Sequence, residues 1–318
     1  MNIFKAYTTG FKTAVRFPGM VVLIYFVNII PALLIALPFF GLLNESIGQS
    51  LSPQKMIRDF DFTVFFDFIN NHESAVNALM AEIKWLTLFY LLISIFLNGG
   101  ILRTLNKRKF TFSSFFAGSG YNFIRFLGLS GLMLALHILL LLIVFVPLSN
   151  ILSSLYDSGF TEDVLFRTAI GVSIFYALLS IILFVVADYA KFYMLLHDTF
   201  NIFKALWQGF RFSFRHFLKT YVLFLFLLLI PALFSYLYIS IEDDIQMISP
   251  EHIFILFIIQ QVVIFLRIWL RIWIFSSQFE LYSAYFVKPD KIESEKQRIE
   301  GWEKKADDID KAFENWQK

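Results

Sequence analysis

The sequence predicts an all-α integral membrane protein whose six transmembrane helices form three parallel repeats. Three observations carry this prediction: 58% of the 318 residues are hydrophobic, six long segments contain almost no charged residue, and one sequence pattern recurs along the chain. Because only 16% of the residues are charged, the chain has too little polar surface to cover a water-soluble globule of its size. We therefore expect it to lie in a bilayer.

The composition also limits the chemistry of the protein. A formal net charge of +2 gives no reason to expect nucleic acid as a partner. The absence of Cys excludes disulfides, thiolate catalysis and Cys-ligated metal sites. The five His residues form no ligand pair of the His-Glu-x-x-His kind, and neither a Walker loop nor a nucleophile elbow occurs. We therefore expect no catalytic site, no metal and no cofactor, and we predict that the protein is not an enzyme.

Six segments are long and apolar enough to cross a bilayer core, which takes about 20 residues of helix. The predicted spans are about 20–43, 84–102, 126–148, 168–187, 220–239 and 253–275. The first apolar run is as long as a full span and no cleavage pattern follows it, so we expect no cleavable signal peptide. The sixth is uncharged only as far as Leu266, because Arg267 and Arg271 follow within it.

The repeat is visible in the residues that precede the spans. Residues 2–17 read NIFKAYTTGFKTAVRF and residues 201–217 read NIFKALWQGFRFSFRHF, and the IPALL that begins at Ile30 returns as IPALF at Ile230. A fainter copy, FSSFFAGSGYNFIRF, leads into the third span. The predicted units are about 1–105, 110–195 and 200–286, which together form a transmembrane domain over 1–286. Because each unit holds two spans, successive units begin on the same side of the membrane and are parallel.

Each unit is predicted to begin with a short amphipathic helix, with aromatic side chains on one face and basic side chains on the other. The predicted basic faces contain Lys5, Lys12, Arg16, Arg125, Lys204, Arg211, Arg215 and Lys219. Such a helix is suited to lie in the headgroup plane of the inner leaflet, where each Lys or Arg contributes about 1 kcal/mol of attraction to anionic lipid. Alternatively, these helices pack on the bundle as cytoplasmic elbows. The expected partners are membrane lipids, including those with anionic headgroups.

The orientation follows from the distribution of Lys and Arg, which are retained in cytoplasmic segments. Most of the 27 basic residues lie in four segments of the sequence. These are the segment before the first span, the one between the second and third spans, the one between the fourth and fifth spans, and the residues after 266. The other side of the membrane holds only Lys55, Arg58, Lys84 and Arg167. We therefore predict a multi-pass protein of the cytoplasmic membrane with both termini in the cytoplasm.

Gln260, Arg267 and Arg271 share one face of the sixth span, because seven and four residues separate them. One interpretation is a site for a lipid phosphate or another anion, since Arg binds phosphate oxygens in pairs. The other is that the two Arg side chains reach the interface or pair with Asp188, at the end of the fourth span. Arg103 is a further candidate partner of Asp188, so these five residues form the predicted lipid site or charge clasp.

Other polar residues within the spans are interpreted as hydrogen-bonding contacts between helices. His137 has no second ligand within helical reach, which argues against a metal site. Asn28 and Asn98 have the same interpretation. Two adjacent Gly residues follow Asn98, and they either allow close helix packing or break the helix to expose its backbone.

Two further segments are predicted to be helical. In the charged tail, 287–318, apolar residues recur at helical spacing, and its basic and acidic residues nearly balance. We expect this helix to dock on the cytoplasmic elbows of the same chain or on a partner protein, and the sequence leaves both open. The long outward connection, 44–83, is rich in Phe and is expected to hold a short surface helix.

The chain resembles the six-span bacterial membrane proteins related to the membrane domain of glycerophosphodiester phosphodiesterases. The resemblance rests on the FKA...G...R pattern, the double glycine after Asn98 and the Asp-Tyr-Ala-Lys that begins at Asp188 and leads into NIFKALWQGFRFSFRHFLK. It covers about residues 1–285, and the catalytic barrel of that family is missing, so the resemblance implies a link to lipid or envelope biology and no hydrolase activity.

The sequence therefore predicts a non-catalytic membrane protein that binds or organises lipids, or scaffolds envelope partners. The alternative is a transporter of small molecules or lipids. A transporter requires a polar cavity between the units, lined by Asn28, Asn98, His137 and Gln260.

Overall fold

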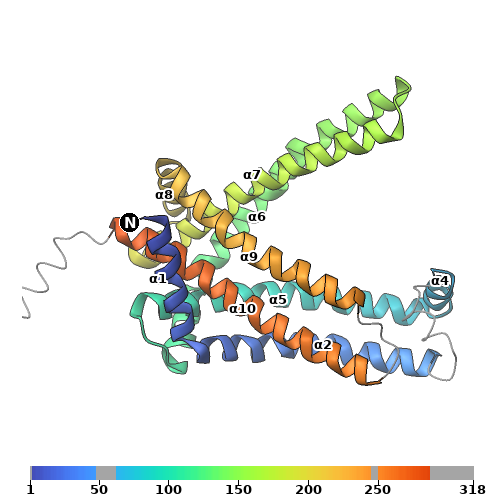
Figure 1. Cartoon of the computed structure of the whole chain (residues 1–318), viewed down its shortest axis with the longest axis horizontal. Coiled ribbons are helices and arrows are strands. Elements are labelled where there is room, and N and C mark those ends of the chain that lie inside the picture. Colours follow the sequence, from blue (N-terminus) through green and yellow to red (C-terminus); the bar gives the residue numbers. More distant parts are fainter. Residues whose placement is uncertain (1, 48–61, 245–249, 287–318) are drawn as a thin grey trace, which may run out of the picture.

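The computed structural model describes residues 2–47, 62–244 and 250–286, and all regular secondary structure in these ranges is helical (Figure 1). The helices are α1 (Ile3–Arg16), α2 (Pro18–Ile47), α4 (Phe62–Asn71), α5 (Glu73–Lys107), α6 (Phe112–Asp157), α7 (Glu162–Leu196), α8 (Ile202–Arg215), α9 (Phe217–Asp244) and α10 (Pro250–Phe286). The predicted tail, 287–318, lies outside the described residues.

Six of these helices are long and apolar enough to cross a membrane: α2, α5, α6, α7, α9 and α10. Each contains one of the six predicted spans, so the prediction of a multi-pass helical membrane protein is confirmed at this level. In the long connection between the first two spans, the short helix α4 is present over Phe62–Asn71.

The long helices meet at the end of the molecule that holds the N-terminus and separate towards the other end (Figure 1). The α6–α7 hairpin projects away from α2, α5, α9 and α10, and its outer half contacts none of them in this view. The short helix α1 runs across the ends of the long helices. We call the shared end, with α1 and α8, the basal end.

The helix breaks at the basal end have local causes. Helix α1 ends at Arg16, and α2 begins at Pro18, whose fixed φ and missing N–H suit the first position of a helix. Helix α8 ends at Arg215, and α9 begins two residues later. The middle unit differs, because α6 runs without a break from Phe112 into the span. The prediction of a separate short helix in that unit is therefore wrong, because Phe112–Asp157 is one continuous helix.

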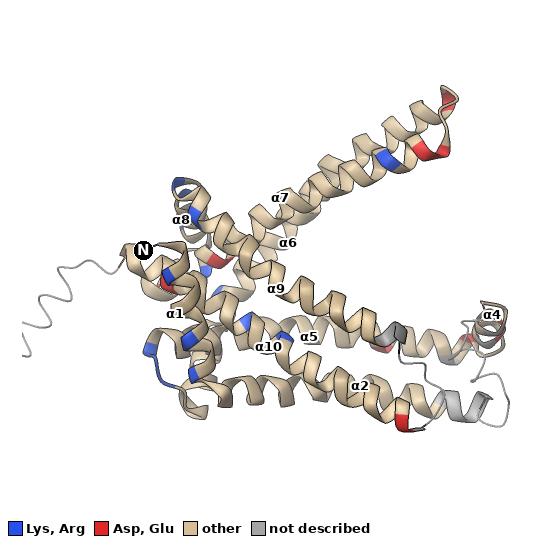
Figure 2. Cartoon of the chain, in the orientation of Figure 1, with Lys and Arg blue, Asp and Glu red and all other residues tan. Residues whose placement is uncertain are grey.

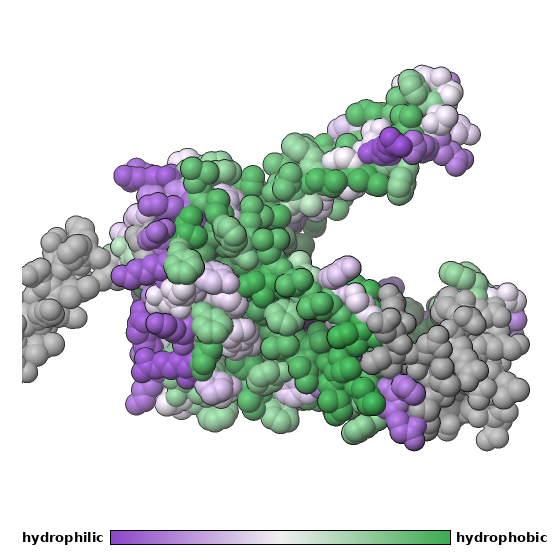
Figure 3. All heavy atoms as spheres, in the orientation of Figure 1, coloured by the Kyte–Doolittle hydropathy of each residue, from purple (hydrophilic) through white to green (hydrophobic). Residues whose placement is uncertain are grey.

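The protein core lies at the basal end, and the outer halves of the long helices expose apolar side chains. The core contains a buried aromatic cluster of Tyr189, Phe192, Phe212 and Tyr282, which belong to α7, α8 and α10. The ring centres of Tyr189 and Phe212 are 4.8 Å apart. Figure 3 shows a hydrophobic surface along the long helices and a hydrophilic band at the basal end, as expected for a chain surrounded by lipid.

Glycines allow α1 and α8 to cross the long helices at very short distances. A methyl group on Gly10 of α1 would lie 2.6 Å from the backbone Cα of Ser277 on α10. A methyl group on Gly209 of α8 would lie 2.8 Å from the backbone nitrogen of Ala190 on α7. Because backbone atoms cannot move aside as a side chain can, both crossings require a residue without a Cβ.

The double glycine of α5 also serves close packing. Helix α5 continues through Gly99 and Gly100 without a break. A methyl group on Gly99 would lie 3.0 Å from the carbonyl oxygen of Gly118 on α6, and one on Gly100 would lie 2.7 Å from the ring of Phe115. The expectation that these residues allow close packing is confirmed, and the alternative of a broken helix is not.

Candidate functional site

Basic side chains gather at the basal end, as Figure 2 shows. The exposed basic residues of α1, α8 and the start of α9 are Lys5, Lys12, Arg16, Lys204, Arg211, Arg215 and Lys219. Large apolar side chains on the same helices are also exposed, among them Phe4 at 72%, Phe203 at 75% and Trp207 at 62%. The residues buried in α1 and α8 are mostly small, so these helices pack on the bundle through small side chains and keep both their aromatic and their basic side chains accessible.

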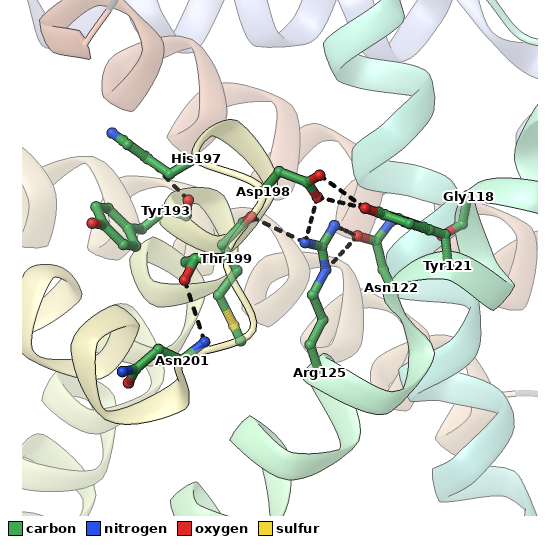
Figure 4. Close-up of polar contacts among 10 residues, drawn as sticks. Gly118, Tyr121, Asn122, Arg125, Tyr193, His197, Asp198, Thr199 and Asn201 are labelled. Atoms are coloured by element: carbon green, nitrogen blue, oxygen red, sulfur yellow. Dashed lines mark hydrogen bonds and ion pairs between the residues drawn. The ribbon is translucent and has the colours of Figure 1, made fainter.

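Arg125 does not belong to this exposed set, which corrects the prediction. It is 2% exposed, and its guanidinium donates hydrogen bonds to Asn122 Oδ1, to the carbonyl oxygen of Met194 at 3.3 Å and to Asp198 Oδ1 at 2.9 Å (Figure 4). The guanidinium carbon also lies 4.9 Å from the ring centre of Tyr121. Arg125 is buried because α6 packs this face against α7, where several acceptors converge on its five donors.

Asp198 completes the cluster from the segment between α7 and α8. Its carboxylate accepts hydrogen bonds from the Tyr121 hydroxyl at 2.8 and 2.9 Å and from Arg125. These hydrogen bonds, from Tyr121 first and then Arg125, hold the pKa of the Asp198 carboxyl below its usual value. Asp198 has a φ of 46°, in the left-handed region that Asp tolerates better than most residues. The cluster ties the α7–α8 connection to α6.

The other acids described at the basal end are also paired. Glu280 of α10 forms a 2.8 Å ion pair with Arg108, which follows α5. Asp188 pairs with Lys191 at 3.0 Å, one turn along α7. The prediction that Asp188 clasps Arg103, Arg267 or Arg271 is therefore wrong, since a local partner on the same helix takes its place.

Gln260, Arg267 and Arg271, which were predicted to share one face of α10, lie in two different environments. Arg271 is partly buried and donates hydrogen bonds to Asn98 Oδ1 at 2.8 Å and to Ser94 Oγ at 3.0 Å, both on α5. Arg267 is exposed, and within the described residues it has no hydrogen-bond or ion-pair partner. It lines a cavity of about 440 Å³ between α9 and α10, where Gln260 donates to the Tyr238 hydroxyl at 3.2 Å.

Arg103 of α5, the other predicted partner of Asp188, packs against α6 instead. A methyl group on Gly118 would lie 2.6 Å from its Cβ, and its buried Nε has no hydrogen-bond partner among the described residues. The five residues of the predicted lipid site or charge clasp therefore do not form one site.

Three of the four residues of the predicted transport cavity make hydrogen-bond contacts of their own. The four residues lie on four helices, α2, α5, α6 and α10. Asn98 is bonded to Arg271, and His137 Nδ1 lies 2.8 Å from the carbonyl oxygen of Met133 on its own helix. Only Gln260 lines the cavity between α9 and α10. Asn28 is partly buried on α2.

A second cavity lies at the basal end, where α8 and its C-terminal connection meet the end of α10. It has a volume of about 480 Å³, and its lining includes Arg211, Arg215 and His216 on one side and Tyr285 and Phe286 on the other. Two exposed arginines, a histidine and a tyrosine thus face one space.

The sequence analysis missed Asp198, Glu280 and Tyr285 as site residues. A signal was present for the first two, because Asp198 is the sole acid between 189 and 219 and Glu280 the sole acid between 252 and 289. An isolated acid in a basic segment is a candidate ion-pair partner. Tyr285 had no such signal, since its role depends on where α10 ends relative to α8.

Comparisons of the chain with protein-family models, with curated proteins and with solved structures find no match. Within the part of the chain that the structure describes, no group of three or more His, Asp or Glu side chains could hold a metal ion. The candidate site is therefore defined by its own geometry, namely the accessible cations and aromatic side chains of the basal end.

Proposed function

We propose that this protein is a non-catalytic protein of the cytoplasmic membrane that binds and organises anionic lipids at the inner leaflet. In this proposal the basal end faces the cytoplasm, both termini are cytoplasmic, and α1 and α8 lie in the headgroup region. Exposed aromatic side chains such as Trp207 then enter the boundary of the acyl chains, while Lys and Arg contact lipid phosphates.

One observation carries the proposal. The acids described at the basal end, Asp188, Asp198 and Glu280, are each engaged with a basic residue, as shown above. Basic residues that have no acidic partner among the described residues remain on α1 and α8: Lys5, Lys12, Arg16, Lys204, Arg211 and Arg215. An excess of cations beside exposed aromatic side chains matches an anionic membrane surface, which attracts each accessible Lys or Arg by about 1 kcal/mol.

The proposal includes a threefold arrangement of related units. Helix α1 packs on α10, the start of α6 packs on α5, and α8 packs on α7. The first segment of each unit thus contacts the second span of the preceding one, in an order that closes on itself. Corresponding positions are buried in all three segments: Ala6, Gly10 and Thr13; Phe115, Ser119 and Asn122; Ala205, Gly209 and Phe212.

Arg267 supplies a further proposed lipid contact. It lies ten residues before Ser277, at which α10 crosses α1, and therefore about 15 Å deeper along the helix. An exposed guanidinium at that depth is costly unless it meets an anion or reaches the interface. A lipid phosphate drawn towards the cavity between α9 and α10 provides that anion.

The test compares lipids retained by the full-length protein from mixtures of phosphatidylglycerol and phosphatidylcholine, measured by native mass spectrometry. Wild type is expected to retain the anionic lipid preferentially. Lys5→Gln combined with Lys204→Gln is expected to reduce that preference. The matched control, Lys84→Gln with Arg167→Gln, removes two cations from the opposite end and is expected to leave the preference unchanged. Equal retention of both lipids by wild type would refute the proposal.

The structure offers less support for a transporter. Three of the four residues that a polar cavity requires, Asn98, His137 and Gln260, are already engaged in hydrogen-bond contacts within or between helices. We therefore propose lipid binding and do not carry the transporter forward.

A further inference from the structure

The basal cavity between α8 and α10 has the features of an anion site. Its volume is about 480 Å³, within the range of small-molecule sites, and it is open to the surface. Arg211 and Arg215 line it from one helix and are four residues apart, so both guanidinium groups lie on the same face of α8. Tyr285 closes the opposite side from α10.

Within the described residues, no acidic side chain balances the positive charge in this cavity. The lining contains no Asp or Glu, and neither Arg211 nor Arg215 has an ion-pair partner among the described residues. The acids described at the basal end, Asp188, Asp198 and Glu280, are paired with other residues. A further cation lies at the edge of the cavity, because Lys219 Nζ donates to the Tyr285 hydroxyl at 2.8 Å.

His216 also lines this cavity, next to Arg215 in the sequence. Its ring lies 4.3 Å from that of Tyr285, which fixes its position beside the two arginines. Partial burial lowers the pKa of His216, and the charges of Arg215 and Lys219 lower it further. A nearby carboxylate would act in the opposite direction. The lowered pKa favours the neutral imidazole, which leaves the charge at this position to the arginines.

We propose that this cavity binds the phosphate group of a phosphate monoester, with Arg211 and Arg215 as its principal ligands. Guanidinium groups bind phosphate oxygens in pairs of parallel hydrogen bonds, and a monoester carries close to two negative charges at pH 7. Two arginines on one face match that charge, and the cavity leaves space for a glycerol-sized group beside the phosphate.

This inference rests on the proposed function, because a lipid can reach the cavity only if the basal end lies at the leaflet surface. The same phosphate chemistry occurs in phosphatidic acid and in water-soluble phosphate esters. Two probes distinguish these sources: phosphatidic acid in mixed detergent micelles, and glycerol 3-phosphate in solution. The second needs no bilayer and no contact with lipid.

The experiment measures binding of both probes to the full-length protein by native mass spectrometry and calorimetry. Arg211→Gln combined with Arg215→Gln is expected to weaken binding about tenfold or more, since hydrogen bonds to charged groups are lost. The matched control is Lys84→Gln with Arg167→Gln, which removes the same number of exposed cations from the opposite end of the molecule. It is expected to change binding by less than about twofold. Arg211→Lys with Arg215→Lys keeps the charge and is expected to recover only part of the affinity, because Lys lacks the planar fork.

Each outcome decides the inference. Binding of phosphatidic acid alone, lost in the Gln pair, supports a lipid headgroup as the ligand. Binding of glycerol 3-phosphate, lost in the same pair, supports a soluble ester, and this holds even if the lipid preference tested above is absent. Equal losses in the Arg211–Arg215 pair and in the Lys84–Arg167 control pair, or no binding of either probe, would overturn the site. All four arginine and lysine positions are exposed, so the variants are expected to fold as wild type does.

Discussion

The guanidinium of Arg125, on α6, lies 2.9 Å from the carboxylate of Asp198, which follows α7. The two side chains differ greatly in exposure, at 1% for Arg125 and 62% for Asp198. The pair therefore joins the core of the basal end to its surface, and it fixes the segment from which α8 begins.

Asp198→Asn is expected to lower the thermal stability of the protein, since it removes the charge opposite Arg125. The pKa of Asp198 is lowered on folding, so its contribution to stability is present above the pKa of the unfolded carboxyl. That contribution is lost as the pH falls through the lowered value, below about pH 4. Thermal unfolding in detergent between pH 3 and pH 7 measures this.

The control for Asp198 is Asp163→Asn, which removes an exposed partner of Arg167 on α7. Surface pairs of this kind contribute little, so its melting temperature is expected to stay near that of wild type. If both substitutions lower the melting temperature equally, Asp198 has no special role in joining α7 to α6.

Gly209→Ala is expected to destabilise the protein by about 1–3 kcal/mol, because the added methyl group meets backbone atoms of α7. Gly120→Ala is the matched control. Nothing lies within 4 Å of a methyl group there, and Ala favours a helix over Gly by about 0.5–1 kcal/mol. Unfolding in denaturing detergent can be followed by circular dichroism. The measured stability should fall for Gly209→Ala and rise for Gly120→Ala. A stable Gly209→Ala protein would show that α8 can be displaced at little cost.

Gln278→Met is expected to stabilise the protein by about 1–3 kcal/mol. Gln278 is 0% exposed, and within the described residues neither its amide nitrogen nor its amide oxygen has a hydrogen-bond partner. A buried polar group without a partner costs folding free energy, which an apolar side chain of similar size avoids. Gln261→Met provides the contrast, since it removes the acceptor that binds the Tyr25 hydroxyl at 2.7 Å and is expected to cost about 0.5–1.5 kcal/mol. A loss of stability in Gln278→Met would mean that ordered water binds the amide.

Arg267 and Arg271, one turn apart on α10, are expected to respond differently to substitution. Arg271→Gln should destabilise the protein by about 1.5–3 kcal/mol, because its hydrogen bonds to Asn98 and Ser94 are lost. Arg267→Gln should leave unfolding within about 0.5 kcal/mol of wild type but reduce the amount of anionic lipid retained. Thermal unfolding and native mass spectrometry separate the two effects. Unchanged lipid retention in Arg267→Gln would remove this residue from the proposed lipid contacts.

The helical content and the six apolar helices could be predicted because they depend on local properties. Hydropathy over about 20 residues identifies a span regardless of what packs beside it. The helix break after Arg16 is also local, since Pro18 follows at once. The absence of the same break after Arg125 was harder to predict, because the middle copy of the repeat resembles the others only faintly.

The amino-acid sequence alone was enough to indicate where the chain crosses the bilayer and that its basic residues gather at one end. Only the packing of the helices decided which of those cations are accessible. Arg16 and Arg125 occupy corresponding positions in the proposed repeat, yet one is exposed and the other is enclosed with Asp198. The physical reason is that burial depends on the neighbour across the helix crossing. The helix that carries Arg16 packs on α10, whereas the helix that carries Arg125 packs on both α5 and α7. The hydrophobic periodicity of one segment does not show which helix will pack against it.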